Sequence, residues 1–142
     1  EEAFDTMRKL DLGYKDFEQL YRRMVFNVLS GNIDDHARNF SFLMDRTGRW
    51  SLAPAYDIVY SIDPSVLEVQ KGQSLSICGK KFGIRKEDLI HIGRYYDINR
   101  PGEVIERTKD VLSNLHGYMK EEGISDSVWK MVSAELKSKE IG

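Results

Sequence analysis

The stretch GNIDDHARNFSFLMDRTGRWSLAPAYD (residues 31–57) decides how the chain is organised. Residues 31–40 hold two acids, a histidine, an arginine and two asparagines, with an apolar segment on either side. Two short apolar runs then flank the turn residues Asp45-Arg46-Thr47-Gly48, which is typical of a β-hairpin. Because the two arms of a hairpin cancel in length, we expect Asp57 to return beside Asn39.

An amphipathic helix is predicted immediately before this stretch. From Asp16 to Ser30 the apolar residues recur at helical spacing on one face: Phe17, Leu20, Tyr21, Met24, Val25, Val28 and Leu29. Asp16 is the predicted N-cap, with Gln19 completing a capping box. Gly31 is expected to end the helix in the left-handed conformation. A shorter helix is predicted before it, ending at Gly13.

The residues after Asp57 predict a second half that is mainly helical. The predicted elements are a surface loop (61–74), a second small hairpin turning near Gly79 (75–84), and helices over 85–96, from Pro101 to Gly123, and after a cap at Ser125 or Asp126. No repeat, low-complexity tract or linker divides the chain. We therefore expect one domain over residues 1–142, mostly α (α+β), with one or two small β-hairpins next to the polar loop.

The composition excludes several classes of protein and site. Lys and Arg total 21 against 23 acids, and the formal net charge of −2 does not favour a nucleic-acid-binding domain, although it does not exclude a local basic patch. Cys78 is the only cysteine, which rules out an intrachain disulfide and favours a reducing compartment. The three histidines (His36, His91, His116) are too widely separated to suggest a zinc site. No apolar run approaches the length of a membrane span and no signal peptide opens the chain, so we expect a cytoplasmic location.

The polar loop has residues that suit Mg²⁺-assisted phosphoryl transfer. Asp34 lies five positions before Asn39, and Asp57 lies eighteen positions after it. In such a reaction one carboxylate orients the attacking hydroxyl, while an amide oxygen and a second carboxylate hold magnesium. A structural alternative remains open, in which Asp34 or Asp35 closes a turn by accepting backbone amides and Asn39 is a turn residue.

Residues 24–61 resemble the C-terminal lobe of the HipA family of bacterial serine/threonine kinase toxins. The resemblance is carried by the N-x-D-D-H-x-[KR]-N loop, the FSFLM strand and the LAPAYD segment, and the loop has the D-x-x-x-x-N spacing of a kinase catalytic loop. It implies that Asp34 is the catalytic aspartate and that Asn39 and Asp57 bind Mg²⁺, with Asp57-Ile58-Val59 in place of the kinase DFG tripeptide. The residues implied to lie beside ATP are His36, Ala37, Arg38, Asn39, Tyr56 and Asp57.

Three of these positions have structural alternatives. His36 is equally consistent with a packed or capping histidine. Tyr56 is also consistent with a core residue whose hydroxyl is tethered, and Arg38 with a solvated surface charge. The three residues Asp34, Asn39 and Asp57, taken together, favour the functional interpretation.

The resemblance also sets expectations about the parent protein. Kinases of this type carry a glycine-rich loop and an ATP-anchoring lysine before the catalytic loop, whereas only 33 residues, predicted to be helical, precede Asp34 here. We therefore expect the N-terminal lobe to be absent from this chain, and the isolated chain to be inactive. The family implies phosphorylation of a protein hydroxyl, in characterised members on an aminoacyl-tRNA synthetase, with growth arrest and persistence. It also implies a HipB-like helix-turn-helix antitoxin as partner, through which any contact with DNA would be indirect.

Two alternatives come from other functional classes. One is a non-catalytic interaction or regulatory module that binds an antitoxin, which predicts decay of the catalytic set, whereas Asp34, Asn39 and Asp57 are all present. The other is a metal-dependent phosphoesterase that uses Asp34, Asp35 and His36 as one cluster.

Overall fold

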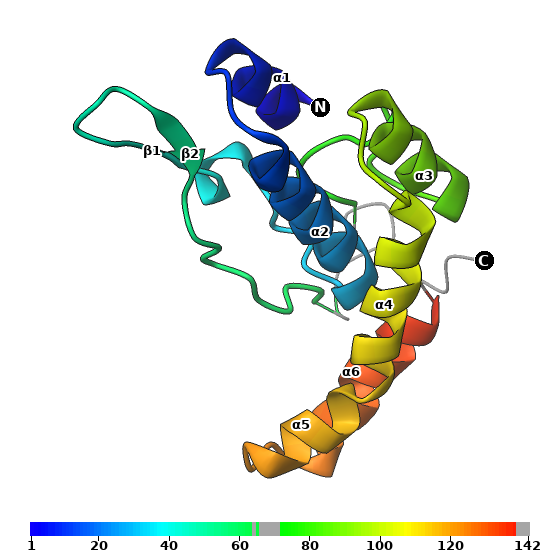
Figure 1. The fold of residues 1–142 in the computed structure, drawn as a ribbon. Helices are drawn as coiled ribbons and strands as arrows, with labels where there is room; N and C mark the ends of the chain where they lie inside the picture. Colours follow the sequence, from blue (N-terminus) through cyan, green and yellow to red (C-terminus); the bar gives the residue numbers. More distant parts are fainter. Residues whose placement is uncertain (64, 66–71, 139–142) are drawn as a thin grey trace.

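The computed structural model describes residues 1–63, 65 and 72–138, which are mostly helical with one small sheet (Figure 1). The strands β1 (Phe42–Met44) and β2 (Trp50–Leu52) are antiparallel, with Leu43 opposite Ser51. The helices are α1 (Glu2–Lys9), α2 (Tyr14–Ser30), α3 (Lys86–Tyr95), α4 (Pro101–Ser113), α5 (Leu115–Glu121) and α6 (Asp126–Ser138), and a 3₁₀ turn, η1, covers Ala37–Asn39. The predicted mostly α fold with a small hairpin is confirmed.

Helix α2 is at the centre of the fold because its apolar face is covered by α1, α3 and α4. Tyr21, fully buried on this face, donates a hydrogen bond through its hydroxyl to the carbonyl of Leu89, which lies in α3, at 3.0 Å. Burial raises the pKa of the Tyr21 hydroxyl. Helices α3 and α4 approach closely at Gly93, where an added Cβ would lie 2.4 Å from the Cβ of Pro101. The core cluster therefore ties the N-terminal helices to the segment that begins at α3.

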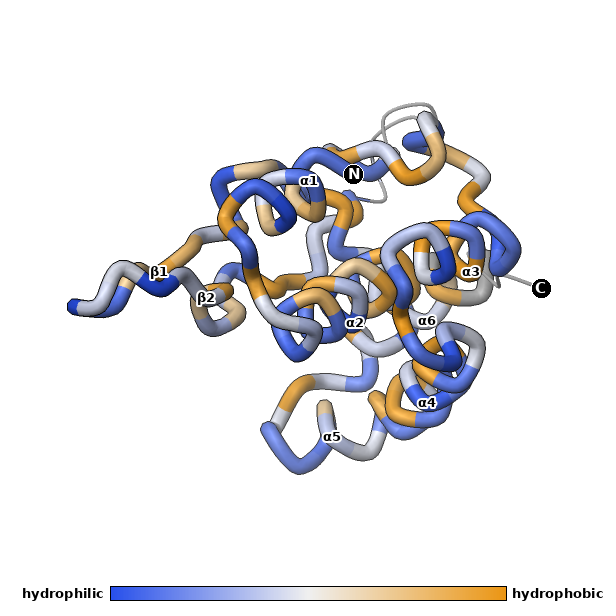
Figure 2. Tube along the Cα trace, turned by 45° about the horizontal axis from the view of Figure 1, so that its top comes forward, coloured by the Kyte–Doolittle hydropathy of each residue, from blue (hydrophilic) through white to orange (hydrophobic). Residues whose placement is uncertain are grey.

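The hairpin projects from the helical body, and the turn between its strands is hydrophilic (Figure 2). Asp45 stabilises this turn because its carboxylate accepts the amides of Thr47 and Arg49 at 2.8 and 3.0 Å. The hydroxyl of Thr47, which donates to the same carboxylate at 2.6 Å, and these backbone amides hold the pKa of the Asp45 carboxyl below its usual range. The base of the hairpin reaches the core through the buried Leu52 and the partly buried Phe42.

The predicted cap of α2 is wrong at its N-terminus and confirmed at its C-terminus. The helix begins at Tyr14 with Gly13 as N-cap, and no side chain caps it. Asp16 instead accepts the backbone amide of Leu52 in β2 at 2.8 Å, so its carboxylate attaches the hairpin to the helix. At the other end Gly31 has the expected left-handed conformation, with φ +80°.

Two predicted elements of the second half differ from the structure. The predicted hairpin over 75–84 is reduced to a single bridge between Ile77 and Lys80, around a turn at Gly79. The single helix predicted from Pro101 to Gly123 is divided at Asn114, whose side-chain amide donates to the carbonyl of Asp110 at 3.0 Å. Side chains that bond nearby backbone in this way compete with helix continuation.

Other predicted boundaries agree with the structure. Pro101 is the first residue of α4, and α3 lies within the predicted 85–96 segment. The last helix begins at Asp126, with the carbonyl of Ser125 accepting the amides of Val128 and Trp129. Of the predicted surface loop 61–74, residues 64 and 66–71 lie outside the described residues. None of the helices within the described ranges combines the length and the apolar character that crossing a membrane requires.

Candidate functional site

The polar loop begins where Gly31 reverses the chain at the end of α2, and buried asparagines hold its first residues. Asn32 is 1% exposed, and its side-chain amide donates to the Oδ1 of Asn27 at 3.2 Å. The same amide reaches the backbone carbonyl of Asp57 at 3.5 Å. The side chains of Asn27 and Asn32 thus form a buried hydrogen bond that supports the first residues of the loop.

Ser61 joins the loop to the segment that follows the hairpin. Its Oγ accepts the backbone amides of Ile33 and Asp34, at 2.8 and 3.1 Å, and donates to the Oδ1 of Asn32 at 3.3 Å. The backbone amide of Ser61 also donates to the carbonyl of Gly31. These bonds return the chain after the hairpin to the start of the loop, as the length of the hairpin predicts.

Asp34 and Asn39 are connected across the loop. The side-chain amide of Asn39 donates to the backbone carbonyl of Asp34 at 3.0 Å, which closes the loop over η1. This contact uses the nitrogen of Asn39 and leaves its Oδ1 without a hydrogen bond to any described residue. The carboxylate of Asp34 is 61% exposed, and its Oδ1 lies 3.9 Å from the Nε2 of His36.

Asp57 comes to the same place as Asn39. Both residues line one small pocket, together with Asn32 and Tyr56. Asp57 has the left-handed backbone conformation, with φ +54°, which non-glycine residues rarely adopt and which often marks a functional position. Its carboxylate is exposed and has no hydrogen-bond partner among the described residues.

The oxygen atoms at this pocket fit a magnesium ion in kind. A carboxylate from Asp57 and an amide oxygen from Asn39, neither bonded to a described donor, are hard ligands of the type that Mg²⁺ prefers. A magnesium site of this kind usually keeps several waters and binds substrate phosphates, so it does not need a full cage of protein ligands.

The remaining predicted nucleotide contacts are distributed around the 3₁₀ turn. His36 is the residue before the turn, and its Nδ1 is buried without a hydrogen-bond partner among the described residues. Ala37 and Arg38 lie in the turn and are exposed. Tyr56 lines the pocket, and its hydroxyl donates to the carbonyl of Arg38 at 2.7 Å and contacts Ser41. That tether supports the structural alternative for the hydroxyl, although the ring, 41% exposed, is not a core residue.

Asp35 points away from Asp34 and is part of the structural framework. It is 4% exposed, and its carboxylate accepts the amides of Ser74 and Leu75, at 2.8 and 3.2 Å, and the side-chain amide of Gln73 at 3.3 Å. Burial raises the pKa of the Asp35 carboxyl and outweighs the opposite effect of these hydrogen bonds. Across residues 1–63, 65 and 72–138, no three His, Cys, Asp or Glu side chains come together as a metal-binding group. A phosphoesterase cluster of Asp34, Asp35 and His36 is therefore not assembled.

Arg23 is a site residue that the sequence analysis did not identify. Its Nη2 donates to the carbonyl of Ala53 at 2.7 Å, and its buried Nη1 has no hydrogen-bond partner among the described residues. Burial lowers the pKa of this guanidinium, although it stays positively charged at any physiological pH. Arg23 lines the pocket that Asn39 and Asp57 share.

Asn27, Asn32 and Ser61 were also missed as positioning residues. Asn27 carries a signal that is visible in the sequence, because it is a polar residue close to the apolar face of the helix between Met24 and Val28. Ser61 has no such signal, since its role depends on the return of the chain after the hairpin.

The comparisons with known proteins agree in pointing to one family. The sequence profile of the family described as "HipA-like C-terminal domain" matches residues 1–117. A Haemophilus influenzae protein named "Putative kinase" is 44% identical over 46 residues, which is 32% of this chain and 13% of that protein. A Sinorhizobium fredii protein named "Putative kinase Y4dM" is 28% identical over 102 residues, which is 68% of this chain and 25% of that protein. The matched segment is thus a quarter or less of the length of these relatives.

Proposed function

The chain belongs to the family of HipA-like C-terminal domains, and from this premise we propose that it is the catalytic C-terminal lobe of a serine/threonine protein kinase. The reaction would transfer the γ-phosphate of ATP, with Mg²⁺, to the hydroxyl of a protein substrate. The names of the two relatives support the kinase class, and the pocket at the polar loop supports the position of the site.

Each residue would have a role that its surroundings allow. The exposed carboxylate of Asp34 would orient the substrate hydroxyl and accept its proton. Asn39, through Oδ1, and Asp57, through its carboxylate, would hold magnesium, which when bound neutralises charge on the transferring phosphate. His36, Ala37, Arg38 and Tyr56 would lie beside the nucleotide.

One observation carries this proposal. Asn39 and Asp57 are separated by a hairpin, yet they line one pocket with oxygen atoms that no described donor binds. Asn39 also bonds the backbone of Asp34, so the proposed base and the proposed metal ligands belong to one rigid loop. Both oxygens are accessible, so they are free to bind a hydrated cation.

The wider context of the enzyme is part of the proposal. We propose that a lobe cradling the ATP phosphates comes from outside residues 1–142, because the relatives are much longer than the matched segment. Residues 1–142 alone would then show no kinase turnover. By family, the substrate would be an aminoacyl-tRNA synthetase and the partner a HipB-like antitoxin, so that activity arrests growth in the cytoplasm and DNA is contacted only through the antitoxin.

The metal ligands can be tested without turnover. Mn²⁺ replaces Mg²⁺ at oxygen sites and broadens nearby NMR signals, so its addition to the 142-residue chain should broaden the side-chain amide of Asn39 and the backbone amide of Asp57. Asp57→Asn should remove this broadening, whereas Asp110→Asn, which alters an exposed acid on α4, should leave it unchanged. Equal broadening in the native chain and in Asp57→Asn would contradict the assignment.

The catalytic aspartate is tested in the longest natural protein that contains residues 1–142, with transfer of labelled γ-phosphate as the measurement. Asp34→Asn should lower kcat by roughly 10²-fold or more, because general base catalysis contributes about 10²–10⁴-fold. Asp110→Asn should keep full activity, and unchanged melting curves should exclude unfolding. Unaltered transfer by Asp34→Asn would remove Asp34 from the mechanism, and a protein without transfer in any form would favour a non-catalytic module.

A further inference from the structure

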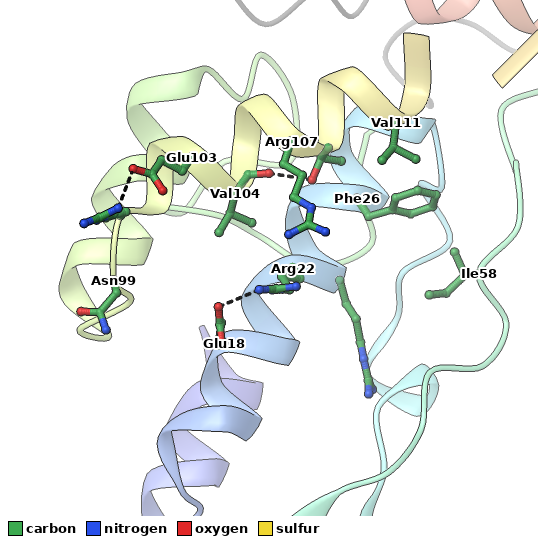
Figure 3. Close-up of a pocket in the computed structure, with 12 residues that line it drawn as sticks. Glu18, Arg22, Phe26, Ile58, Asn99, Glu103, Val104, Arg107 and Val111 are labelled. Atoms are coloured by element: carbon green, nitrogen blue, oxygen red, sulfur yellow. Dashed lines mark hydrogen bonds and ion pairs between the residues drawn. The ribbon is translucent and has the colours of Figure 1, made fainter. Parts of the chain in front are cut away.

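An open groove lies between α2 and α4 (Figure 3), and it shares Arg23 and Ile58 with the pocket at the polar loop. Its volume of about 520 Å³ is within the range of sites that bind small ligands or peptide side chains. None of the residues proposed above for phosphoryl transfer lines this groove. The question is what kind of molecule its walls would bind.

The charges of the groove are mainly positive. Among its described lining residues are four arginines and two glutamates, which leave a net charge of +2 in a chain whose total is −2. The two glutamates are already paired, Glu18 with Arg22 at 2.8 Å and Glu103 with Arg100 at 3.2 Å. Arg107 has no ion pair or hydrogen bond from its side chain to the described part of the chain.

Two central arginines lie on opposite walls of the groove. Figure 3 shows Arg107 on α4 extending toward Arg22 on α2, whose own guanidinium is paired with Glu18. Because Glu18 already neutralises Arg22, Arg107 carries the unpaired positive charge, and a carboxylate of a ligand would form charge-assisted hydrogen bonds with it.

Apolar side chains form the adjoining end of the groove. Phe26 on α2, Val111 on α4 and Ile58 gather there, and Val111 and Ile58 are 46% and 38% exposed. Exposed apolar groups next to the unpaired Arg107 suit a ligand that carries both an acidic and an apolar side chain. A simple inorganic anion would leave this apolar end uncovered.

We propose that this groove docks an acidic and apolar peptide segment of a partner protein. A carboxylate of the segment pairs with Arg107, beside the Arg22–Glu18 ion pair, and a neighbouring apolar side chain packs on Phe26 and Val111. Charge complementarity favours a peptide over a nucleic acid, because the groove is one short cleft flanked by Glu18 and Glu103 rather than a continuous basic stripe. Since Ile58 directly follows Asp57, the docked segment would lie beside the pocket at the polar loop; the docking itself does not depend on kinase activity.

The probe is a fluorescein-labelled peptide of roughly ten residues that alternates Glu with Leu and Phe, titrated with the 142-residue chain in fluorescence anisotropy. Arg107→Ala should weaken binding by about tenfold, because the charge-assisted hydrogen bonds to the peptide carboxylate are lost. Arg46→Ala removes the same charge from the exposed hairpin turn and should change binding less than about twofold. On binding, the methyl signals of Ile58, Val104 and Val111 should shift.

Several results would overturn the proposal. Equal weakening by Arg46→Ala, or equal binding of a peptide with Ser in place of Leu and Phe, would indicate general charge attraction. Equal binding of a peptide with Gln in place of Glu would indicate non-specific apolar contact. Equal competition by a single-stranded oligonucleotide would identify a nucleic-acid surface instead. Self-association that Arg107→Ala abolishes and the peptide does not displace would identify a second copy of the chain as the occupant.

Discussion

At the scale of single residues, the neighbouring acids Asp34 and Asp35 have opposite surroundings. The carboxylate of Asp34 is largely exposed, whereas that of Asp35 is buried and accepts hydrogen bonds from the segment around Ser74. A one-residue step along an extended loop turns successive side chains in opposite directions, so one acid faces solvent and the other faces the interior. The spacing to Asn39 identifies the same acid, Asp34, as the candidate base.

Asp35→Ala should destabilise the fold by about 2–4 kcal/mol, because it leaves the donors of Ser74, Leu75 and Gln73 unpaired in the interior. The measurement is urea unfolding followed by circular dichroism. Asp110→Ala, at an exposed position on α4, is the matched control and should change stability by less than about 0.5 kcal/mol.

The same substitution has a predicted pH dependence. Burial raises the pKa of Asp35 in the folded protein, so the folded state binds this proton more tightly than the unfolded chain does. The resulting stabilisation is complete below the unfolded pKa, about 4, and is lost as pH rises through the higher folded pKa. The stability difference between the native chain and Asp35→Ala should therefore narrow as pH rises above about 4, and a difference that widens would contradict the prediction.

At the scale of elements, the end of α2 is the junction on which the loop depends. Gly31 has φ +80°, and a Cβ at this position would lie 2.9 Å from the Cδ1 of Ile62 and 3.2 Å from the ring of Tyr60. Both the backbone conformation and the close approach require glycine here. Ile62, which packs against this junction, directly follows Ser61, whose hydroxyl accepts the backbone amide of Asp34.

Gly31→Ala should lower stability by roughly 1–3 kcal/mol, from left-handed strain and from displacement of the Ile62 side chain. Gly102→Ala is the matched control, since its Cβ would meet nothing within 4 Å in the first turn of α4. That control should be neutral or stabilising by up to about 1 kcal/mol. Thermal unfolding of both variants provides the comparison, and equal effects would show that the junction has no special requirement.

At the scale of the whole molecule, the hydrophobic core cluster lies outside the two C-terminal helices, α5 and α6. The hydrophobic cluster draws its buried residues from positions between Phe4 and Ile105, and the partly buried residues around it end at Leu112. Helices α5 and α6 project below α2 and α4 in Figure 1 and contact mainly α4 and each other. The family match likewise ends at residue 117.

A chain that ends at Asn114 should therefore keep a cooperative thermal transition, because its core cluster is intact. Its Tm should fall by no more than about 4–8 °C, the shift that corresponds to about 1 kcal/mol in a domain of this size. Differential scanning calorimetry of the two chains makes the comparison. A truncated chain without a cooperative transition would show that α5 and α6 belong to the folding unit.

Local sequence determined much of this molecule. Apolar periodicity predicts α2 and α3, and Pro101 predicts the start of α4. Gly31 predicts where α2 ends, and Gly48 predicts where the hairpin reverses direction. The spacing of Asp34, Asn39 and Asp57 also predicts that a hairpin brings Asp57 back to Asn39, and these two residues line one pocket. These features depend on contacts within a few residues or on the geometry of one short hairpin, and both can be inferred from sequence.

Only the tertiary structure decided the partners of the polar side chains. Asp16 binds β2 rather than its own helix, Asp35 binds residues about forty positions away, and Ser61 holds the loop from beyond the hairpin. The groove with Arg22 and Arg107 likewise exists because α2 and α4 pack together although seventy residues, 31–100, separate them in the sequence. A carboxylate or hydroxyl accepts whatever donor the packed chain brings within about 3 Å, and that donor is selected by the whole fold, not by the neighbouring sequence.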